Sequence, residues 1–222
     1  MNKNVAMIRK IGGLGLVGVL GLGAGGASAV DFNASADVQN ALAVTVVQDM
    51  NFGTLFAAKA NSSAISSIQL APNGDIAAIT GLAIGGVVGD APSFLTLGGG
   101  VAAARGSVAT SSNFTLTVPN LPRAGLKDGS GVFDSAGGVV VQVSSDPSEP
   151  AFYLTDFTVG DPVGATIVAG SGPGEFDVDP GFEVPSVEFG IGATINTDGA
   201  GGVRTAYQAA TYTGTFEVTA SF

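Results

Sequence analysis

Three acidic side chains have a spacing that could do chemistry: Glu175, Asp177 and Asp179. Alternate residues of a strand share one face, so these carboxylates could present oxygen ligands to Ca²⁺. We favour the alternative, a solvated strand face, because acidic side chains are usually exposed. The stretch Asn196-Thr197-Asp198-Gly199 begins like a calcium loop, but Tyr207 stands where the closing Glu belongs, so a hairpin turn is predicted there. The sequence therefore predicts neither a metal site nor a cofactor.

Residues that most hydrolases and transferases need are missing from the composition. The chain contains no His and no Cys, which removes Ser-His-Asp and Cys-His arrangements and ordinary zinc or copper sites. No phosphate loop or dinucleotide-binding glycine pattern lies between a strand and a helix. Two carboxylates suffice for glycoside hydrolysis, but there is no Trp and there are only 3 Tyr to line a sugar-binding cleft. We therefore predict that the protein is not an enzyme.

The charge of the chain argues against nucleic acid as a partner. The sequence has 18 acidic and 8 basic residues, a formal net charge of −10. Phosphate neutralisation requires clustered Lys and Arg, so the acidity is expected to serve solubility instead. After the N-terminal basic residues, those that remain are Lys59, Arg105, Arg123, Lys127 and Arg204.

Residues 1–29 have the composition of a signal peptide. Lys3, Arg9 and Lys10 form a positive start, an apolar stretch follows, and Ala27-Ser28-Ala29 is a small-x-small cleavage site. The apolar stretch is shorter than the roughly 20 residues that span a membrane. We expect export, after which residues 30–222 form a single domain that is extracellular, on the cell surface or periplasmic.

The stretch Ala210–Phe222 shows the clearest structural pattern. Tyr212, Phe216 and Val218 alternate with Thr and Glu, and Gly214 lies on the apolar face. This period of two predicts a strand with one face on a core. Further strands are predicted at residues 31–38, 41–47, 50–56, 65–70, 76–80, 82–88, 93–97, 113–118, 139–143, 151–159, 165–169 and 185–195.

Gly, Pro and Asp turns separate these stretches, and helix is scarce. The Ala-rich residues 57–64 and 102–108 are predicted to hold at most one helical turn each. Many short strands joined by tight turns favour an all-β fold, namely an immunoglobulin-like antiparallel β-sandwich with Greek-key connections. The core is expected to include Phe52, Gly53, Phe189, Tyr212, Gly214, Phe216 and Val218.

Three stretches carry a resemblance to a known family. Asn51-Phe52-Gly53-Thr54 resembles the "FG" corner, and Ala210–Phe222 the closing strand, of the secreted bacterial domain-of-unknown-function 4402 family. Val187–Ile195 is similar to its penultimate strand. The same signals are distantly similar to spore coat protein U-like pilins of the archaic chaperone–usher systems. The resemblance implies a Gram-negative bacterium and a pilin-like fimbrial or cell-surface protein.

Such pilins lack one strand of their sandwich, and the N-terminal segment of the next subunit supplies it by strand addition. Asp31–Val38 has the alternation that such a donor needs, with Phe32, Ala34, Ala36 and Val38 on one face. The alternative is that this segment pairs within its own sheet. The implied partners are copies of the protein or related surface subunits, and a periplasmic chaperone and usher.

A small outer-membrane β-barrel is the rival class. Such barrels also follow a signal peptide and often close on a strand ending in Phe. They carry aromatic girdles at both membrane interfaces, and this chain has too few Tyr and no Trp to build them. Strands such as residues 113–118 are also short for the roughly 9–11 residues that cross a bilayer. We therefore prefer a non-catalytic exported structural subunit that assembles by β-strand addition.

Overall fold

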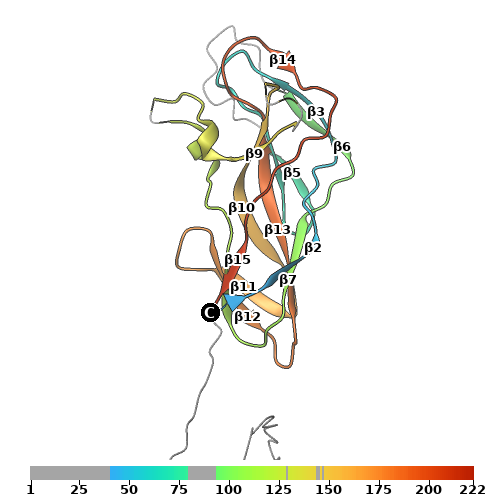
Figure 1. Cartoon of the computed structure of the whole chain (residues 1–222), viewed down its shortest axis with the longest axis vertical. Coiled ribbons are helices and arrows are strands. Elements are labelled where there is room, and N and C mark those ends of the chain that lie inside the picture. The colour runs from blue at the N-terminus through green and yellow to red at the C-terminus, as the bar shows by residue number, and fades with distance from the viewer. Residues whose placement is uncertain (1–40, 80–93, 129, 144–145, 147) are drawn as a thin grey trace, which may run out of the picture. The chain divides into compact units, whose positions relative to one another are not determined.

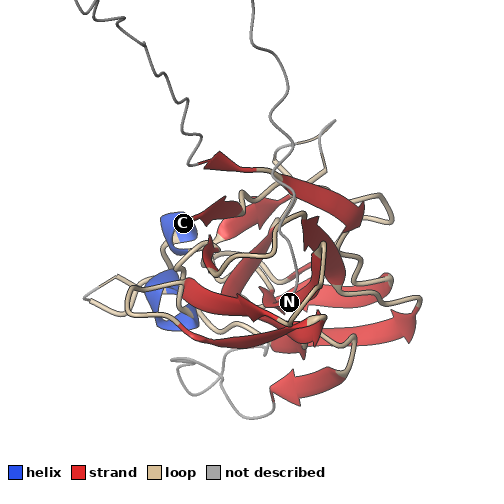
Figure 2. Cartoon of the chain, turned by 90° about the horizontal axis from the view of Figure 1, so that it is seen from below, coloured by secondary structure: helices blue, strands red, loops and turns tan. Residues whose placement is uncertain are grey.

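Two long antiparallel strands, β10 (Phe152–Val163) and β13 (Val187–Asn196), form the centre of the folded region (Figure 1). The computed structural model describes residues 41–79, 94–128, 130–143, 146 and 148–222. Within them, regular structure is almost entirely strand, and the 3₁₀ turns η1 (Arg123–Leu126) and η2 (Ser135–Gly137) lie together at one side (Figure 2). The predicted all-β class is confirmed. The predicted strands at residues 31–38 and 82–88 lie outside the described residues.

The described strands form three sheets in which every pair is antiparallel. The seven-stranded sheet has the order β2-β7-β13-β10-β9, with β4 paired to β13 and β5 to β4. The five-stranded sheet has the order β1-β15-β8-β12-β11, and the three-stranded sheet the order β14-β3-β6. The other bounds are β1 (Ala41–Leu42), β2 (Val44–Gln48), β3 (Thr54–Lys59), β4 (Ser67–Leu70), β5 (Ile76–Ile79), β6 (Phe94–Gly99), β7 (Ala104–Val108), β8 (Phe114–Thr117), β9 (Val139–Val141), β11 (Ala165–Ala169), β12 (Glu175–Pro180), β14 (Thr205–Ala206) and β15 (Thr219–Ser221).

The five- and seven-stranded sheets pack face to face and enclose the main core. Leu116 of β8 and Val178 of β12 meet side chains of β13, and all belong to one buried cluster. Phe189 is 0 % exposed, and a Cβ on Gly106 of β7 would come within 2.8 Å of its ring. Glycine at that position therefore lets the ring lie directly on the neighbouring strand. We call this region the closed core.

The chain changes sheets at Ala43. The predicted strand over residues 41–47 is two strands, because β1 pairs with β15 while β2 pairs with β7. The five-stranded sheet therefore loses its edge strand after Leu42. Beyond Leu42, β1 therefore no longer flanks the C-terminal segment that borders the candidate site.

The Ala-rich stretches contain no helical turn, which agrees with the prediction of at most one in each, and part of each stretch lies in a strand. Ala57 lies in β3, and Ala104 begins β7, which pairs with both β13 and β2. Ala104, Gly106 and Val108 face the interior in strict alternation. Helix propensity is a weak preference, and pairing on both edges overrides it here.

Two Asp residues bend β10. Asp156 and Asp161 have φ values of 47° and 49°, and the register with β13 shifts at both positions. Asp tolerates the left-handed conformation better than most residues, and such bulges increase strand twist. The Asp156 carboxylate also accepts a hydrogen bond from the Arg123 N–H at 2.9 Å. The first bulge thereby anchors η1 to the sheet.

Candidate functional site

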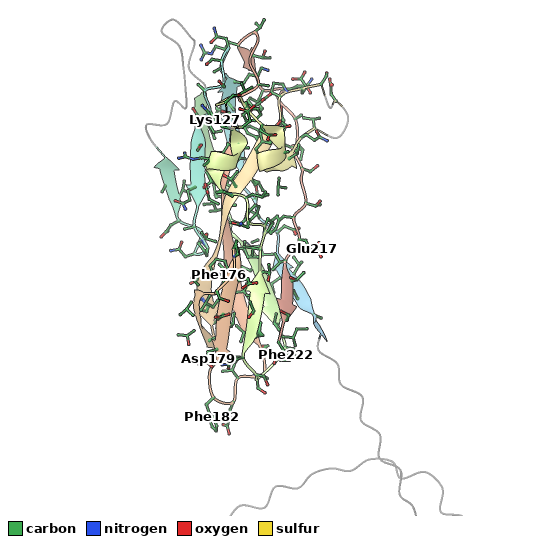
Figure 3. All side chains as sticks on the ribbon, turned by 90° about the vertical axis from the view of Figure 1, so that its left-hand side faces the viewer. Lys127, Phe176, Asp179, Phe182, Glu217 and Phe222 are labelled. Carbon is green, nitrogen blue, oxygen red and sulfur yellow. The ribbon has the colours of Figure 1, made fainter. Side chains whose placement is uncertain are left out.

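The three carboxylates predicted to share a strand face do lie on β12, alternating with the inward side chains. Two of them are engaged locally: Glu175 accepts from the Gly172 N–H at 2.8 Å, and Asp177 accepts from the Thr115 hydroxyl at 3.1 Å. Figure 3 shows Asp179 beyond them on the same strand. Among the residues that the structure describes, no three His, Cys, Asp or Glu side chains form a group that could hold a metal ion.

The stretch Asn196–Gly199 is buried, and the prediction of a hairpin turn was wrong. β13 pairs with β4, β7 and β10 but not with β14, the strand that follows it. The Asn196 amide donates to the Tyr153 carbonyl and the Thr155 hydroxyl, both at 2.9 Å, and accepts from the Ser67 hydroxyl at 2.6 Å. A buried amide satisfied in this way stabilises the junction of three strands.

Next to the closed core, the seven-stranded sheet faces a large apolar groove of about 1400 Å³. One wall, the first rim, is formed by residues 44–57, and the other, the terminal rim, by residues 206–218. In Figure 1 the terminal rim is the red coil that joins β14 to β15. The floor is the inner face of the seven-stranded sheet, with Ala104, Val141, Phe152, Leu154, Ile191 and Ile195.

Backbone pairing joins the two rims at one end of the groove and joins the segments that flank them at the other end. At one end β14 pairs with β3, and the Tyr207 N–H donates to the Ala57 carbonyl at 3.1 Å. At the other end Leu42 of β1 pairs with Ala220 of β15. Between these closures no hydrogen bond joins the rims within the described part of the chain. The groove is therefore a slot bounded at both ends and open along its length.

The terminal rim is extended but only partly paired, so the predicted strand over Ala210–Phe222 is formed only at β15. Thr213 forms an isolated bridge to Gln142, with hydrogen bonds of 2.9 and 3.0 Å, and the next residues up to Val218 belong to no strand. The predicted alternation is nevertheless present. Inward Tyr212, Phe216 and Val218 are half-buried, and the Thr and Glu residues between them are exposed.

An aromatic cluster covers the end of the groove near β14. Phe152 stacks on Tyr207 at 4.2 Å between ring centroids and meets Tyr212 edge-on at 5.1 Å. The Tyr207 hydroxyl donates to the Ala151 carbonyl at 2.9 Å and accepts from the Asp198 N–H at 2.6 Å. Burial raises the pKa of Tyr207, and also that of Tyr212. This end of the groove therefore offers neutral aromatic surface and no acid–base pair.

The "FG" corner builds the first rim. Gly53 has a φ of 67°, and its N–H donates to the Asn51 side chain at 2.7 Å. A Cβ at Gly53 would collide with the backbone of Gly99 on β6, so both conformation and space require glycine there. Asn51 exchanges two backbone hydrogen bonds with Ala102, at 2.8 and 2.7 Å. This fixed corner holds the half-buried Phe52 in the wall of the groove.

Charged side chains are few in the lining of the groove. Arg105 is paired with Asp161 at 2.9 Å, and Asp49 and Glu217 lie on the rims. A slot with an apolar floor and polar margins suits a segment that is apolar on one face and polar on the other.

Only one of the aromatic and Val residues expected in the core is fully enclosed. Phe189 is buried, whereas Phe52, Tyr212, Phe216 and Val218 are half-buried because they face the groove. The sequence reasoning also missed several groove residues: Met50, Leu55, Leu154, Ile191, Ile195 and Tyr207. For Leu55, Leu154, Ile191 and Ile195 the signal was their place within predicted strands. The predicted interaction residues Phe32, Ala34, Ala36 and Val38 lie outside the described residues.

No family model, curated protein or solved structure matches the chain. The resemblance to a secreted family therefore stays a prediction. Among the described residues, no helix is long and apolar enough to cross a membrane.

Proposed function

We propose that this protein is a non-catalytic, exported structural subunit of the cell surface or of a fimbrium, and that it assembles by β-strand addition. In this proposal a signal peptide is removed, and the remaining chain forms an immunoglobulin-like sandwich with Greek-key connections. A periplasmic chaperone and an usher would handle the subunit before assembly.

One observation carries the proposal: the terminal rim borders the apolar groove but belongs to no strand between Gly214 and Val218. The side chains of Phe216 and Val218 line the groove on this side. Unpaired backbone groups on a strand edge are ready to pair with another chain. An added strand would satisfy them and would cover the half-buried side chains of the terminal rim.

The size of the groove favours a peptide segment over a small molecule. Ligand pockets commonly enclose about 300–1,000 Å³ and surround the ligand, whereas this groove of about 1400 Å³ is an open slot between two rims. Alternate side chains of an extended segment would point at the floor, and the others would point at solvent. Main-chain hydrogen bonds would provide affinity, and the side-chain pockets would set the register.

The test compares a chain that begins at Val30 with a variant that lacks Asp31–Val38. We expect polymers from the first, seen by gel filtration and negative-stain microscopy, and a folded but aggregation-prone monomer from the second. Adding a synthetic peptide of the deleted sequence should raise the melting temperature of the variant, because a ligand that binds only the folded state stabilises it.

A peptide with Phe32 and Val38 replaced by Asp is the matched control and should have no effect. Two results would contradict the proposal. One is a stable monomer of the chain from Val30 at every concentration. The other is unfolding of the deletion variant that the peptide does not reverse, which would show that the segment completes its own domain.

A further inference from the structure

We propose that the peptide bond between Asp161 and Pro162 is a self-cleavage site, at which the Asp161 carboxylate breaks its own backbone. The product is a nicked protein whose two pieces stay paired through the sheets. This inference is independent of the proposed function, because the reaction needs neither export nor a partner.

A strained backbone and a proline leaving group combine at this bond. Asp161 has a φ of 49°, whereas a residue before proline prefers an extended backbone with a φ of about −120°. A left-handed conformation at a residue other than glycine stores strain. Asp156 also has a positive φ, 47°, but no proline follows it, and Asp179 precedes a proline without a positive φ. Among the residues that the structure describes, only Asp161 combines both features.

The bond is not held in a ladder of hydrogen bonds. It lies at the second shift of register between β10 and β13, so neither Asp161 nor Pro162 has a paired residue on β13. Both residues are exposed, so solvent reaches the bond. The other bond of this kind, between Asp179 and Pro180, is different, because both residues pair with β11.

The Asp161 side chain is fixed on the surface by an ion pair. The Arg105 Nη1 donates to one carboxylate oxygen, Oδ2, at 2.9 Å. No hydrogen bond from the described part of the chain reaches the other oxygen, Oδ1, which is therefore available as a nucleophile. Attack on the main-chain carbonyl carbon of the same residue closes a small ring, and an intramolecular nucleophile of this kind needs no encounter step.

The reaction balances with water as its co-reactant. A bond forms between Oδ1 and the main-chain carbonyl carbon of Asp161, and the bond from that carbon to the Pro162 nitrogen breaks. The nitrogen keeps the electron pair and takes a proton from solvent. Proline favours this step because its tertiary amide nitrogen is more basic than that of an ordinary peptide. Water then opens the cyclic anhydride, which leaves Asp161 as a C-terminus and Pro162 as an N-terminus.

The two pieces should remain together after the cut. The first piece keeps most of β10, and the second contains β13. The pairs of β10 with β13 from Tyr153–Asn196 to Gly160–Gly190 all join the two pieces across the cut. The pairs of β7 with β13 and of β8 with β12 do the same. We therefore expect a folded protein made of two chains.

The test follows the new N-termini by intact mass spectrometry of the full chain. The protein is kept in mildly acidic buffer, either folded or unfolded in guanidinium chloride at the same pH, and circular dichroism checks each state. The piece that begins at Pro162 reports the proposed site, and the piece that begins at Pro180 reports the matched control bond. We expect the ratio of these two cleavage rates to be at least about tenfold higher in the folded protein, because only folding imposes the strain.

Two variants test the nucleophile. Asp161→Asn removes the carboxylate and keeps a side chain that tolerates the left-handed conformation. We expect the piece that begins at Pro162 to form at least about tenfold more slowly in this variant, with cleavage before Pro180 unchanged. Asp179→Asn is the matched control and should slow only cleavage before Pro180. Gel filtration of the nicked wild-type protein should give the elution volume of the intact chain.

Four results would overturn the inference. The same rate ratio in folded and unfolded protein would show that the backbone conformation does not activate the bond. No cleavage after Asp161 in the folded protein would show that the fold protects it. Unchanged cleavage of Asp161→Asn would exclude the side-chain carboxylate as the nucleophile, and separation of the pieces on gel filtration would exclude the paired product. None of these results bears on strand addition, so the proposed function is tested separately.

Discussion

The two ends of β13 carry the same alternating pattern and yet have different surroundings. At Val187 and Phe189 the inward side chains meet β8 and β12 and are fully buried in the closed core. At Ile191 and Ile195 the inward side chains are also buried, with 4 % and 2 % of their surface exposed, but they line the groove, opposite a rim that is only partly paired. A period of two therefore establishes that a strand has an apolar face. Whether that face is closed off by other strands or borders a groove depends on the second layer of strands that packs against it.

The same comparison separates two kinds of glycine. Gly106 lies under Phe189, where the closed core meets the groove, and permits close packing of a ring. Gly53 and Gly214 border the groove, where a Cβ would strike the backbone of a neighbouring segment. The glycines at the groove therefore shape the rims, and the glycine in the core accommodates a side chain.

The largest effect is expected in the closed core. Phe189→Ala should lower the free energy of unfolding by about 3–5 kcal/mol, because it removes a fully buried ring from a packed cluster. Urea denaturation of the chain that begins at Val30 measures the loss, and Val168→Ala on the exposed face of β11 is the control. A loss below about 1 kcal/mol, the size of a surface effect, would show that the core is not closed there.

The next effect is expected at the "FG" corner. Gly53→Ala should cost about 2–3 kcal/mol, since it combines a positive φ with a collision against Gly99. Gly74→Ala is the matched control: its φ is 90°, but no atom lies within 4 Å of the added Cβ. Thermal unfolding of the two variants compares strain plus collision with strain alone. Equal losses of stability in the two variants would show that the collision with Gly99 does not contribute to the effect.

A smaller effect is expected on the terminal rim. Phe216→Ala should cost about 1–2 kcal/mol in the isolated monomer, because the ring is half-buried and one side faces the groove. The loss should grow once the donor peptide is bound, since the bound peptide would cover the open side. Urea denaturation with and without the peptide measures both values. A loss as large as that of Phe189→Ala would mean that the groove is already filled in the monomer.

The smallest effect concerns Tyr153, which packs on the outer face of the seven-stranded sheet with Ile65, Leu126 and Phe133. Burial, and then the charge of Asp198, raises the pKa of Tyr153 to about 12. The unfolded chain loses this proton at about pH 10, so stability should fall as the pH rises from about 10 toward 12. Tyr153→Phe should make that fall shallower, as measured by urea denaturation at several pH values.

An unchanged slope in Tyr153→Phe would contradict that assignment. Tyr207→Phe makes a poorer probe, because the Tyr207 hydroxyl also bonds the Ala151 carbonyl and the Asp198 N–H. Removing the Tyr207 hydroxyl would leave these two backbone groups without their partner. The resulting loss of stability would then be mixed with the effect of the tyrosine titration.

The sequence by itself determined the class of structure, because that information is local. Alternation at Glu175–Asp179 and at Tyr212–Val218 identified which side chains share a face, and the structure confirms both. The absence of His and Cys likewise restricted the chemistry before any contact was known. Turn residues limited helix to short pieces, as η1 and η2 show.

The tertiary structure alone decided which apolar faces are covered. The sequence of residues 41–47 does not predict that the chain changes sheets at Ala43. The crossing depends on pairing with β7 and β15, which lie far away in the sequence. The Ala-rich β7 is a strand because it is paired on both edges. Tyr212 and Phe216 line a groove for the same kind of reason: no strand among the residues that the structure describes continues the edge position that β1 leaves. Which apolar faces are covered depends on pairing between segments that are distant in the sequence, and a local pattern cannot predict that pairing.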